Sequence, residues 1–213
     1  MTEACWTFEP VFPESYREER YRVFIVGSEP HERPGEGWRP DRRDTGLWFR
    51  TAPDNANWGN ENFYVRTVEQ LHAVLATLGV KPDSDRDALC HLRHLDLKAT
   101  GGGTEADRDQ VSQWVLANID KVAGYWATDK PAVTVLLGYP TWWVFEQHVT
   151  RILRSRGVEV VRVALQHPSR YPNNPQALRE LKEHLQPLTQ PLHRWAPKKR
   201  KWEVWPQPPG PAI

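Results

Sequence analysis

Short apolar runs that end in Gly or in turn-forming residues recur along the chain, and between them apolar residues recur at helical spacing. Runs of four or five apolar, mostly β-branched residues are typical of strands that are buried on both faces. The pattern predicts strands over residues 23–26, 88–97, 133–137 and 158–165. Helical spacing and cap signals predict helices over 67–78, 104–122, 141–156 and 174–185.

Strands that alternate with helices define the expected fold class. We expect an α/β protein, a three-layer α/β/α sandwich with a central, mostly parallel four-stranded sheet. Residues 1–187 would form this domain, and 188–213 a Pro- and Trp-rich basic tail, largely irregular, packed on it or extending from it. The Gly-, Pro- and aromatic-rich segment 32–64 is predicted to be a folded loop that covers the site.

Composition narrows the class of protein. The net charge of +1 over 213 residues argues against a whole-molecule polyanion binder, although basic residues can still cluster. The two cysteines, Cys5 and Cys90, belong to no Cys-x-x-Cys pair, so a thiolate-held zinc or iron–sulfur site is not expected. No apolar run approaches a membrane span, no signal-peptide pattern begins the chain, and the two separated cysteines fit a reducing compartment, so we expect a cytoplasmic protein. We also expect a monomer without a cofactor.

Polar, chemically capable residues follow three of the predicted strands. The first strand runs into Gly27-Ser28-Glu29-Pro30-His31, the second ends in Asp96-Leu97-Lys98, and the fourth runs into His167-Pro168-Ser169. The carboxyl ends of parallel strands meet at one edge of the sheet, where open α/β sheets bind ligands. The plain alternative for Glu29 is a solvated acid in a turn, and for His167 a loop histidine with its hydrogen bonds satisfied.

These segments, together with Thr45-Gly46-Leu47-Trp48-Phe49, resemble the motifs of the uracil-DNA glycosylase superfamily. They occur in the family's order over roughly residues 22–185. The resemblance implies an enzyme that flips a nucleotide out of DNA and hydrolyses its N-glycosidic bond, with DNA as partner and no metal or cofactor.

The resemblance also implies a role for each matching residue. Glu29 would orient or deprotonate the attacking water, and His167 would hydrogen-bond the base oxygen as charge develops there. Phe49 would stack on the base, with Trp48 as its rival, and Asp96 and His31 would also contact the base. The residues implied to contact DNA are Ser169, Arg170, Tyr171, Lys98, Gly101 and Gly102.

Two departures from the family pattern affect the substrate. Glu29 stands where the family has Asp, Asn or Ala, and Asp96 stands where an amide reads uracil. An ionised Asp only accepts hydrogen bonds, so it favours a base edge with an amino donor, such as cytosine. The substrate would then be uracil or a modified base, including a bulky phage-type modified cytosine, in base-excision repair or antiviral defence.

Other functions remain open at this stage. One is a catalytically silent DNA-binding module of the same fold, and another is a hydrolase of free nucleosides. No lysine has a clear position for a Schiff base, so a monofunctional glycosylase is expected rather than a lyase. His31, His91 and His94 lack the spacing of a zinc ligand set. The eleven Trp residues fit either base stacking or core packing.

Overall fold

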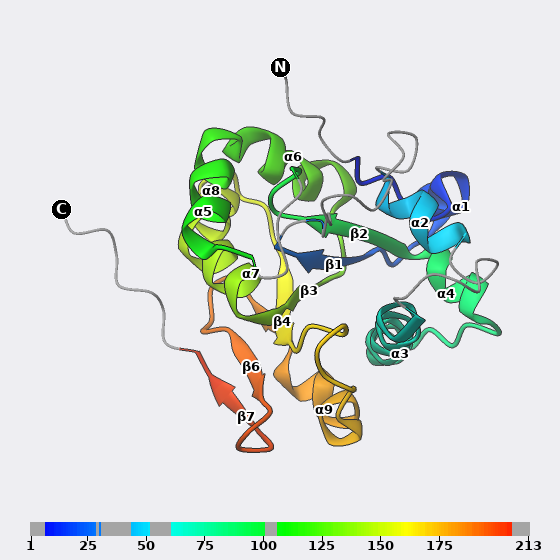
Figure 1. Cartoon of the computed structure of the whole chain (residues 1–213). Helices are drawn as coiled ribbons and strands as arrows, with labels where there is room; N and C mark the ends of the chain where they lie inside the picture. The colour runs from blue at the N-terminus through cyan, green and yellow to red at the C-terminus, as the bar shows by residue number, and fades with distance from the viewer. Residues whose placement is uncertain (1–6, 29, 31–43, 52–60, 101–105, 206–213) are drawn as a thin grey trace, which may run out of the picture.

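The computed structural model describes residues 7–28, 30, 44–51, 61–100 and 106–205. Its centre is a sheet with the strand order β2-β1-β3-β4-β6-β7, in which β5 also pairs with β4 (Figure 1). The first four strands in this order are parallel: β1 (Val23–Gly27), β2 (Leu92–Asp96), β3 (Val133–Leu137) and β4 (Val161–Leu165). The predicted α/β class with a mostly parallel central sheet is therefore confirmed. The predicted number of four strands was wrong, because the sheet has seven strands within the described residues.

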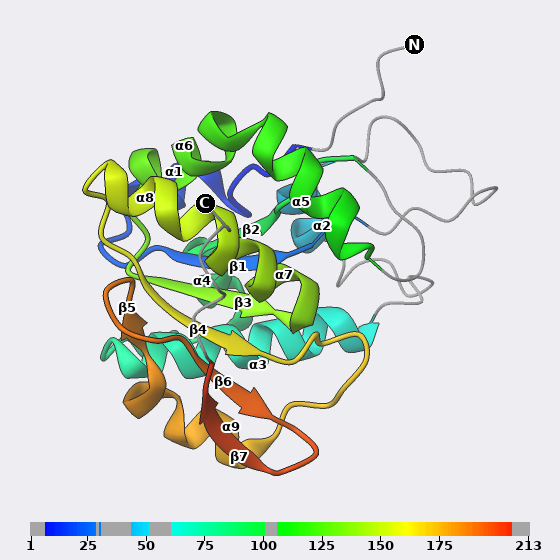
Figure 2. The ribbon, with the colours of Figure 1, turned by 90° about the vertical axis from the view of Figure 1, so that its left-hand side faces the viewer.

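Helices cover both faces of the sheet (Figure 2). One core cluster joins Phe24, Val26 and Leu136 to the first helical layer. This layer consists of α5 (Arg108–Ala117), α6 (Ile119–Asp129), α7 (Gly138–Val144), the π-helix η3 (Phe145–Val149) and α8 (Thr150–Ser155). We call the sheet face that this layer covers the α5–α8 face.

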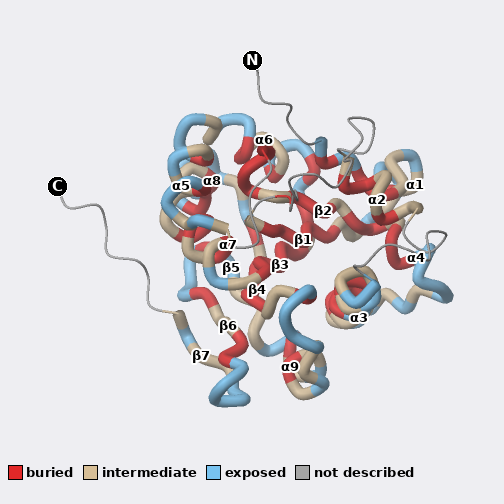
Figure 3. The backbone as a smooth tube through the Cα atoms, in the orientation of Figure 1, coloured by how far each residue is buried: buried red, intermediate tan, exposed pale blue. Residues whose placement is uncertain are grey.

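The opposite core cluster joins Val23, Ile25 and Val135 to the second layer. The helices of this layer are α2 (Thr45–Thr51), α3 (Glu61–Thr77), α4 (Asp85–Cys90), α9 (Pro175–Glu180) and the 3-10 helix η4 (Leu181–His184). We call this the α2–α3 face. The short α1 (Pro13–Glu18) packs beside α4. Burial is concentrated on the strands and on the inner sides of the helices (Figure 3).

Several predicted boundaries were wrong. The predicted strand 88–97 begins with helix α4, because Ser84 caps it by accepting a hydrogen bond from the Asp87 backbone N–H at 3.1 Å. Helix α3 begins at Glu61 rather than at residue 67, and Thr67 is buried inside it. Within the segment predicted as a loop, 45–51 is α2 and 61–64 is the start of α3. The predicted helix 104–122 is two helices that meet at Asn118.

The expectation of an irregular C-terminal tail was also wrong. Besides β5 (Gln186–Pro187), the chain forms the antiparallel pair β6 (His193–Ala196) and β7 (Lys201–Val204), which extends the sheet beyond β4. The indole of Trp195 is buried and contacts Trp202 edge to face, with 5.7 Å between ring centroids. These tryptophans therefore act as core residues, which explains why a Pro-rich segment is ordered here.

A fully buried ion pair attaches this extension to the α5–α8 face. The Arg162 guanidinium donates from Nε and Nη2 to the two carboxylate oxygens of Glu146, each at 2.8 Å. It also donates to three backbone oxygens of the segment around β5, those of Gln186, Pro187 and Gln190. Neither side chain of the pair is more than 3% exposed, so all of its stabilisation depends on internal partners.

Within the described residues, no helix combines the length and the apolar character needed to cross a membrane.

Candidate active site

The carboxyl ends of β1 and β2 bring Gly27, Ser28 and Asp96 together. Gly27 lies opposite Asp96 in the parallel ladder, and the backbone N–H of Lys98 donates to the Ser28 carbonyl at 2.9 Å. A Cβ at position 27 would overlap the Oδ1 atom of Asp96. The glycine that ends the first strand therefore makes room for the carboxylate that ends the second.

His167 follows β4 at the same edge of the sheet. Gly138, which follows β3 with a φ of 76°, lies beside it, because a Cβ there would be 3.5 Å from the His167 Cβ. The Nδ1 atom of His167 lies 2.7 Å from the Ser169 hydroxyl and accepts a long hydrogen bond of 3.4 Å from the Ser169 backbone N–H. A backbone N–H can only donate, so the proton of the neutral ring belongs on Nε2.

The charge state of His167 is set by its surroundings. Burial, and then repulsion from Arg170, lowers the pKa of the His167 imidazole to about 4. The ring is therefore neutral at pH 7 and presents an Nε2–H donor. A neutral donor of this kind can stabilise an oxygen that gains negative charge during a reaction.

Four rings form what we call the aromatic cluster: Phe49, Phe63, His94 and His167. Phe63 is stacked on His167 with 5.6 Å between centroids and meets His94 edge to face at 5.7 Å. Phe49 is 5.4 Å from His94 and 6.0 Å from Phe63. The cluster lies on the α2–α3 face and joins the end of β4 to the middle of β2.

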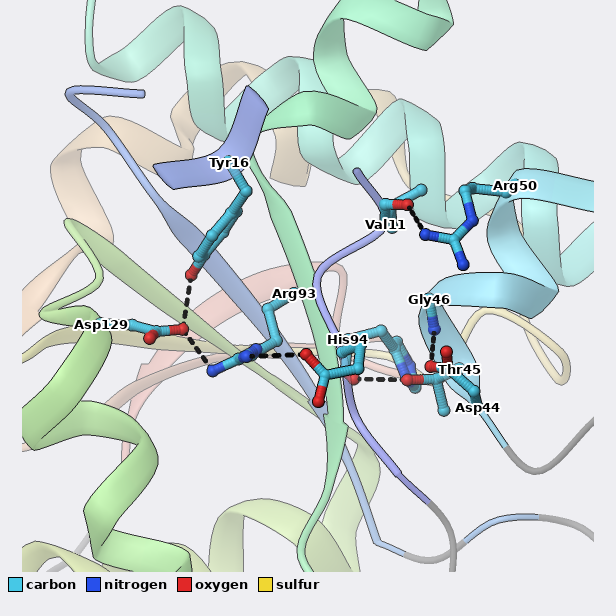
Figure 4. A network of polar contacts seen from close by, with 10 residues as sticks. Val11, Tyr16, Asp44, Thr45, Gly46, Arg50, Arg93, His94 and Asp129 are labelled. Carbon is cyan, nitrogen blue, oxygen red and sulfur yellow. Dashed lines mark hydrogen bonds and ion pairs between the residues drawn. The ribbon is translucent and has the colours of Figure 1, made fainter. Parts of the chain in front are cut away.

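Helix α2 places Phe49 in this cluster. The Thr45 hydroxyl donates to the backbone carbonyl of His94 at 2.8 Å, and the Asp44 carboxylate accepts from the Gly46 N–H at 2.9 Å (Figure 4). Phe49 is only 1% exposed, whereas Trp48 is half-buried and contacts it edge to face at 4.8 Å. Phe49, predicted to stack on a base, therefore packs as a core ring in this structure.

The loop after His167 is tied to α3. Arg66 donates to the Pro168 carbonyl at 2.8 Å, and the Gln70 amide donates to Asn173 at 3.0 Å. Ser169, Arg170 and Tyr171 are exposed on this loop, where they are accessible to a large partner. This arrangement fits their predicted role as DNA contacts.

The remaining predicted site residues divide into two groups. Lys98 lies next to the site but is only 9% exposed. The others, Glu29, His31, Gly101 and Gly102, lie outside the described residues. Over the described part of the chain, no group of three or more His, Cys, Asp and Glu side chains is placed to hold a metal ion.

For Asp96, the plain alternative to a contact with the base is an ion pair with Arg93 or Lys98, which are close to it in the sequence. Arg93 instead pairs with Asp129 at 2.5 Å and with Glu9 at 3.7 Å, and Asp129 also accepts from the Tyr16 hydroxyl (Figure 4). These residues pack on the α5–α8 side of β2, because successive side chains of a strand point to opposite faces. Arg93 is thus committed to a network on the other face of the sheet from His94.

Sequence reasoning considered His94 only as a metal ligand and did not single out Phe63. The signal for His94 was its position two residues before Asp96, which places both side chains on the same face of β2. Burial, and then repulsion from His167, lowers the pKa of His94 to about 3.

This shift predicts a pH-dependent stability. An unfolded His94 takes up a proton near pH 6.5, whereas the folded one does so only near pH 3. The lowered pKa of His94 therefore does not reduce the free energy of unfolding above pH 6.5. Below this pH, the free energy of unfolding falls by up to about 1.4 kcal/mol per pH unit, because the unfolded state binds the proton more readily. Urea unfolding at pH 7, 6 and 5 should show wild type losing stability relative to His94→Leu, with the loss approaching about 1.4 kcal/mol per pH unit only below pH 6. Parallel losses in both proteins would contradict the assignment, and His72→Leu on α3 is the control.

No protein-family model matches the chain, and no curated protein matches it. Among solved structures, the chain is similar to a mutant of UNG, a uracil-DNA glycosylase, from Nitratifractor salsuginis. The two are 16% identical, the match covers 83% of this chain and 79% of that chain, and the TM-score is 0.36. A similarity this weak does not indicate a function for this chain, so the proposed function below is based on the geometry of the site.

Proposed function

We propose that the protein is a monofunctional DNA glycosylase that hydrolyses the N-glycosidic bond of a flipped-out base. The observation that carries this proposal is the state of His167: a neutral imidazole at the carboxyl end of a parallel strand, with Nδ1 turned to Ser169 and Nε2 left to donate. The site edge also carries the Asp96 carboxylate and an exposed loop suited to phosphate contacts.

The chemistry assigns His167 to the leaving base. As the bond from C1′ to the base nitrogen breaks, its electron pair moves onto the base and negative charge builds on a base oxygen. The Nε2–H of His167 would donate to that oxygen. Such a preorganised neutral donor typically contributes about 10²–10³ in rate.

Water completes the reaction. Its oxygen bonds to C1′, one of its protons is released, and the base leaves and takes up a proton. Glu29, which directly follows Ser28 in the chain, would orient this water, and its negative charge would favour the positive charge on the sugar. His31 and Trp48 would contribute further contacts to the base.

The partner in this proposal is DNA. Ser169 and Arg170 would contact phosphates, and Tyr171, which is 49% exposed, would fill the gap left by the flipped nucleotide. Lys98, Gly101 and Gly102 would support the phosphate contacts. Asp96 would select a base edge with an amino donor, which favours a cytosine-type substrate, including modified cytosines, over uracil.

The experiment is base excision from duplexes that carry uracil, hypoxanthine, cytosine or a bulky modified cytosine, with abasic sites detected by alkaline cleavage. We expect excision of at least one base and, from Asp96, preference for an amino-bearing one. Excision of uracil alone would contradict the preference. No excision of any base, together with intact binding to the duplexes, would contradict the enzymatic function and favour the DNA-binding module.

The Glu29→Gln variant separates these functions. Loss of the carboxylate should lower the excision rate by about 10²-fold or more while DNA affinity changes little, because the group acts on water and on the sugar charge. Single-turnover rates and fluorescence anisotropy measure the two quantities, with Glu18→Gln at an exposed position of α1 as control. An excision rate of Glu29→Gln equal to that of wild type would show that Glu29 has no catalytic role.

A further inference from the structure

His94 is a buried polar side chain whose hydrogen-bonding capacity is unused. Its imidazole is 5% exposed, and neither Nδ1 nor Nε2 has a hydrogen-bond partner in the described part of the chain. A buried polar group without a hydrogen-bond partner has a cost in stability. A leucine could fill this buried position without an unsatisfied polar group, so we expect the ring nitrogen atoms of His94 to have a functional role.

The side chains around His94 could accommodate a flat ligand. Phe49 and Phe63 lie against the ring at centroid distances of 5.4 and 5.7 Å, and Phe63 is also stacked on His167. A site with aromatic walls and a few polar atoms is typical for a small heterocycle. Asp96 lies two residues further along the same face of β2, toward the open edge of the sheet.

Phe63 contacts both imidazoles, His94 edge to face and His167 by stacking. It sits in the first turn of α3 and is half-buried, so its ring borders solvent on one side. A change of the Phe63 side-chain rotamer would turn the ring toward this solvent side. Movement of this one side chain would connect His94 with His167.

We propose that His94 is a base-reading residue, the floor of a nucleobase subsite that opens when Phe63 turns away from His167. This inference rests on the proposed glycosylase function and adds to it a residue that selects the base. A neutral imidazole presents an N–H to one acceptor. With Asp96 as acceptor on the same strand face, the pair complements a base edge that offers one amino donor and one acceptor, as cytosine and 5-substituted cytosines do.

The same pair disfavours uracil. Where cytosine has an amino group, uracil has a carbonyl oxygen, which would face the Asp96 carboxylate without a proton between them. Sites with buried hydrogen-bonding groups reject ligands that leave those groups unpaired. His94 and Asp96 together therefore define selectivity for aminopyrimidines.

The test is an NMR titration of the full-length protein with free cytosine and free uracil, each at millimolar concentration. The His94 ring resonance is assigned by its absence in His94→Leu. We expect a saturable shift of this resonance with cytosine and a weaker response to uracil. His94→Leu should bind cytosine at least about 10-fold more weakly, and His94→Gln, which keeps a donor, should stay within about threefold of wild type.

Controls separate recognition from structure. His94→Leu removes an unsatisfied group, so its stability at pH 7 should equal or exceed that of wild type while binding falls. His148→Leu, which removes a half-buried imidazole on the α5–α8 face, should leave binding unchanged. A His94 resonance that neither base moves, or a His94→Leu variant that binds cytosine as wild type does, would overturn the inference.

The experiments can distinguish a failure of the base-reading role of His94 from a failure of the proposed glycosylase function. Base binding that depends on His94, without excision from any duplex, would keep the subsite and reject the glycosylase. Excision with unchanged rate and unchanged base preference in His94→Leu would keep the glycosylase and reject the base-reading role.

Discussion

Replacing Glu146 with Gln is expected to lower the free energy of unfolding by about 3 kcal/mol or more. The change removes the only carboxylate that the structure places against the Arg162 guanidinium within the described residues, and Arg162 is fully buried. An amide can still accept one hydrogen bond, but it leaves the buried charge uncompensated. Few single substitutions at a surface would approach this effect.

The position of the pair explains why the loss should spread. Arg162 also holds the backbone carbonyls of Gln186, Pro187 and Gln190, so it connects β4 to the segment that leads into β6. Weakening it loosens the C-terminal extension of the sheet. Hydrogen exchange of the β6 and β7 amides should therefore increase together with the fall in global stability.

Urea unfolding measures the first effect. Asp120→Asn, which breaks the surface pair with Arg156, is the matched control and should cost no more than about 1 kcal/mol. A Glu146→Gln variant within 1 kcal/mol of wild type would show that the buried pair contributes little.

Hydrophobic patterning predicted the parallel sheet because buried central strands leave an unambiguous signal. Residues 23–26 are apolar throughout, residues 133–137 are apolar except for Thr134, and the structure buries all of β1 and β3. The pattern failed at 88–97, where a cap at Ser84 turns the first half into α4. It also failed at the C-terminus, where Trp195 and the Arg162 contacts order a segment whose composition favours loops. The first failure reflects a local cap that the apolar pattern does not include, and the second is a case in which tertiary contacts override local preference.

The sequence predicted the location of the candidate site better than the roles of its residues. Turn residues after strands mark the sheet edge, and Asp96 and His167 do lie at strand ends. The burial of Phe49 and the contacts of Phe63 with two imidazoles depend on how α2 and α3 pack. Packing of this kind has no local sequence signature, so the aromatic cluster emerged only from the structure.

His167→Phe is the substitution with the largest expected effect on activity. Phenylalanine keeps a flat ring that can stack against Phe63, but it has no N–H to offer a departing base. Loss of one preorganised donor typically lowers the rate by about 10²–10³. DNA affinity should change little, because the interaction develops only as the bond breaks.

The most direct test of the proposed catalytic site is the single-turnover excision rate of His167→Phe, with His148→Phe as control. The substrate is the duplex from which wild type excises the base fastest. The account predicts a rate about 10²–10³ lower than that of wild type, with DNA affinity within about threefold and the control unchanged. An excision rate equal to that of wild type would contradict the assignment of this sheet edge as the catalytic site.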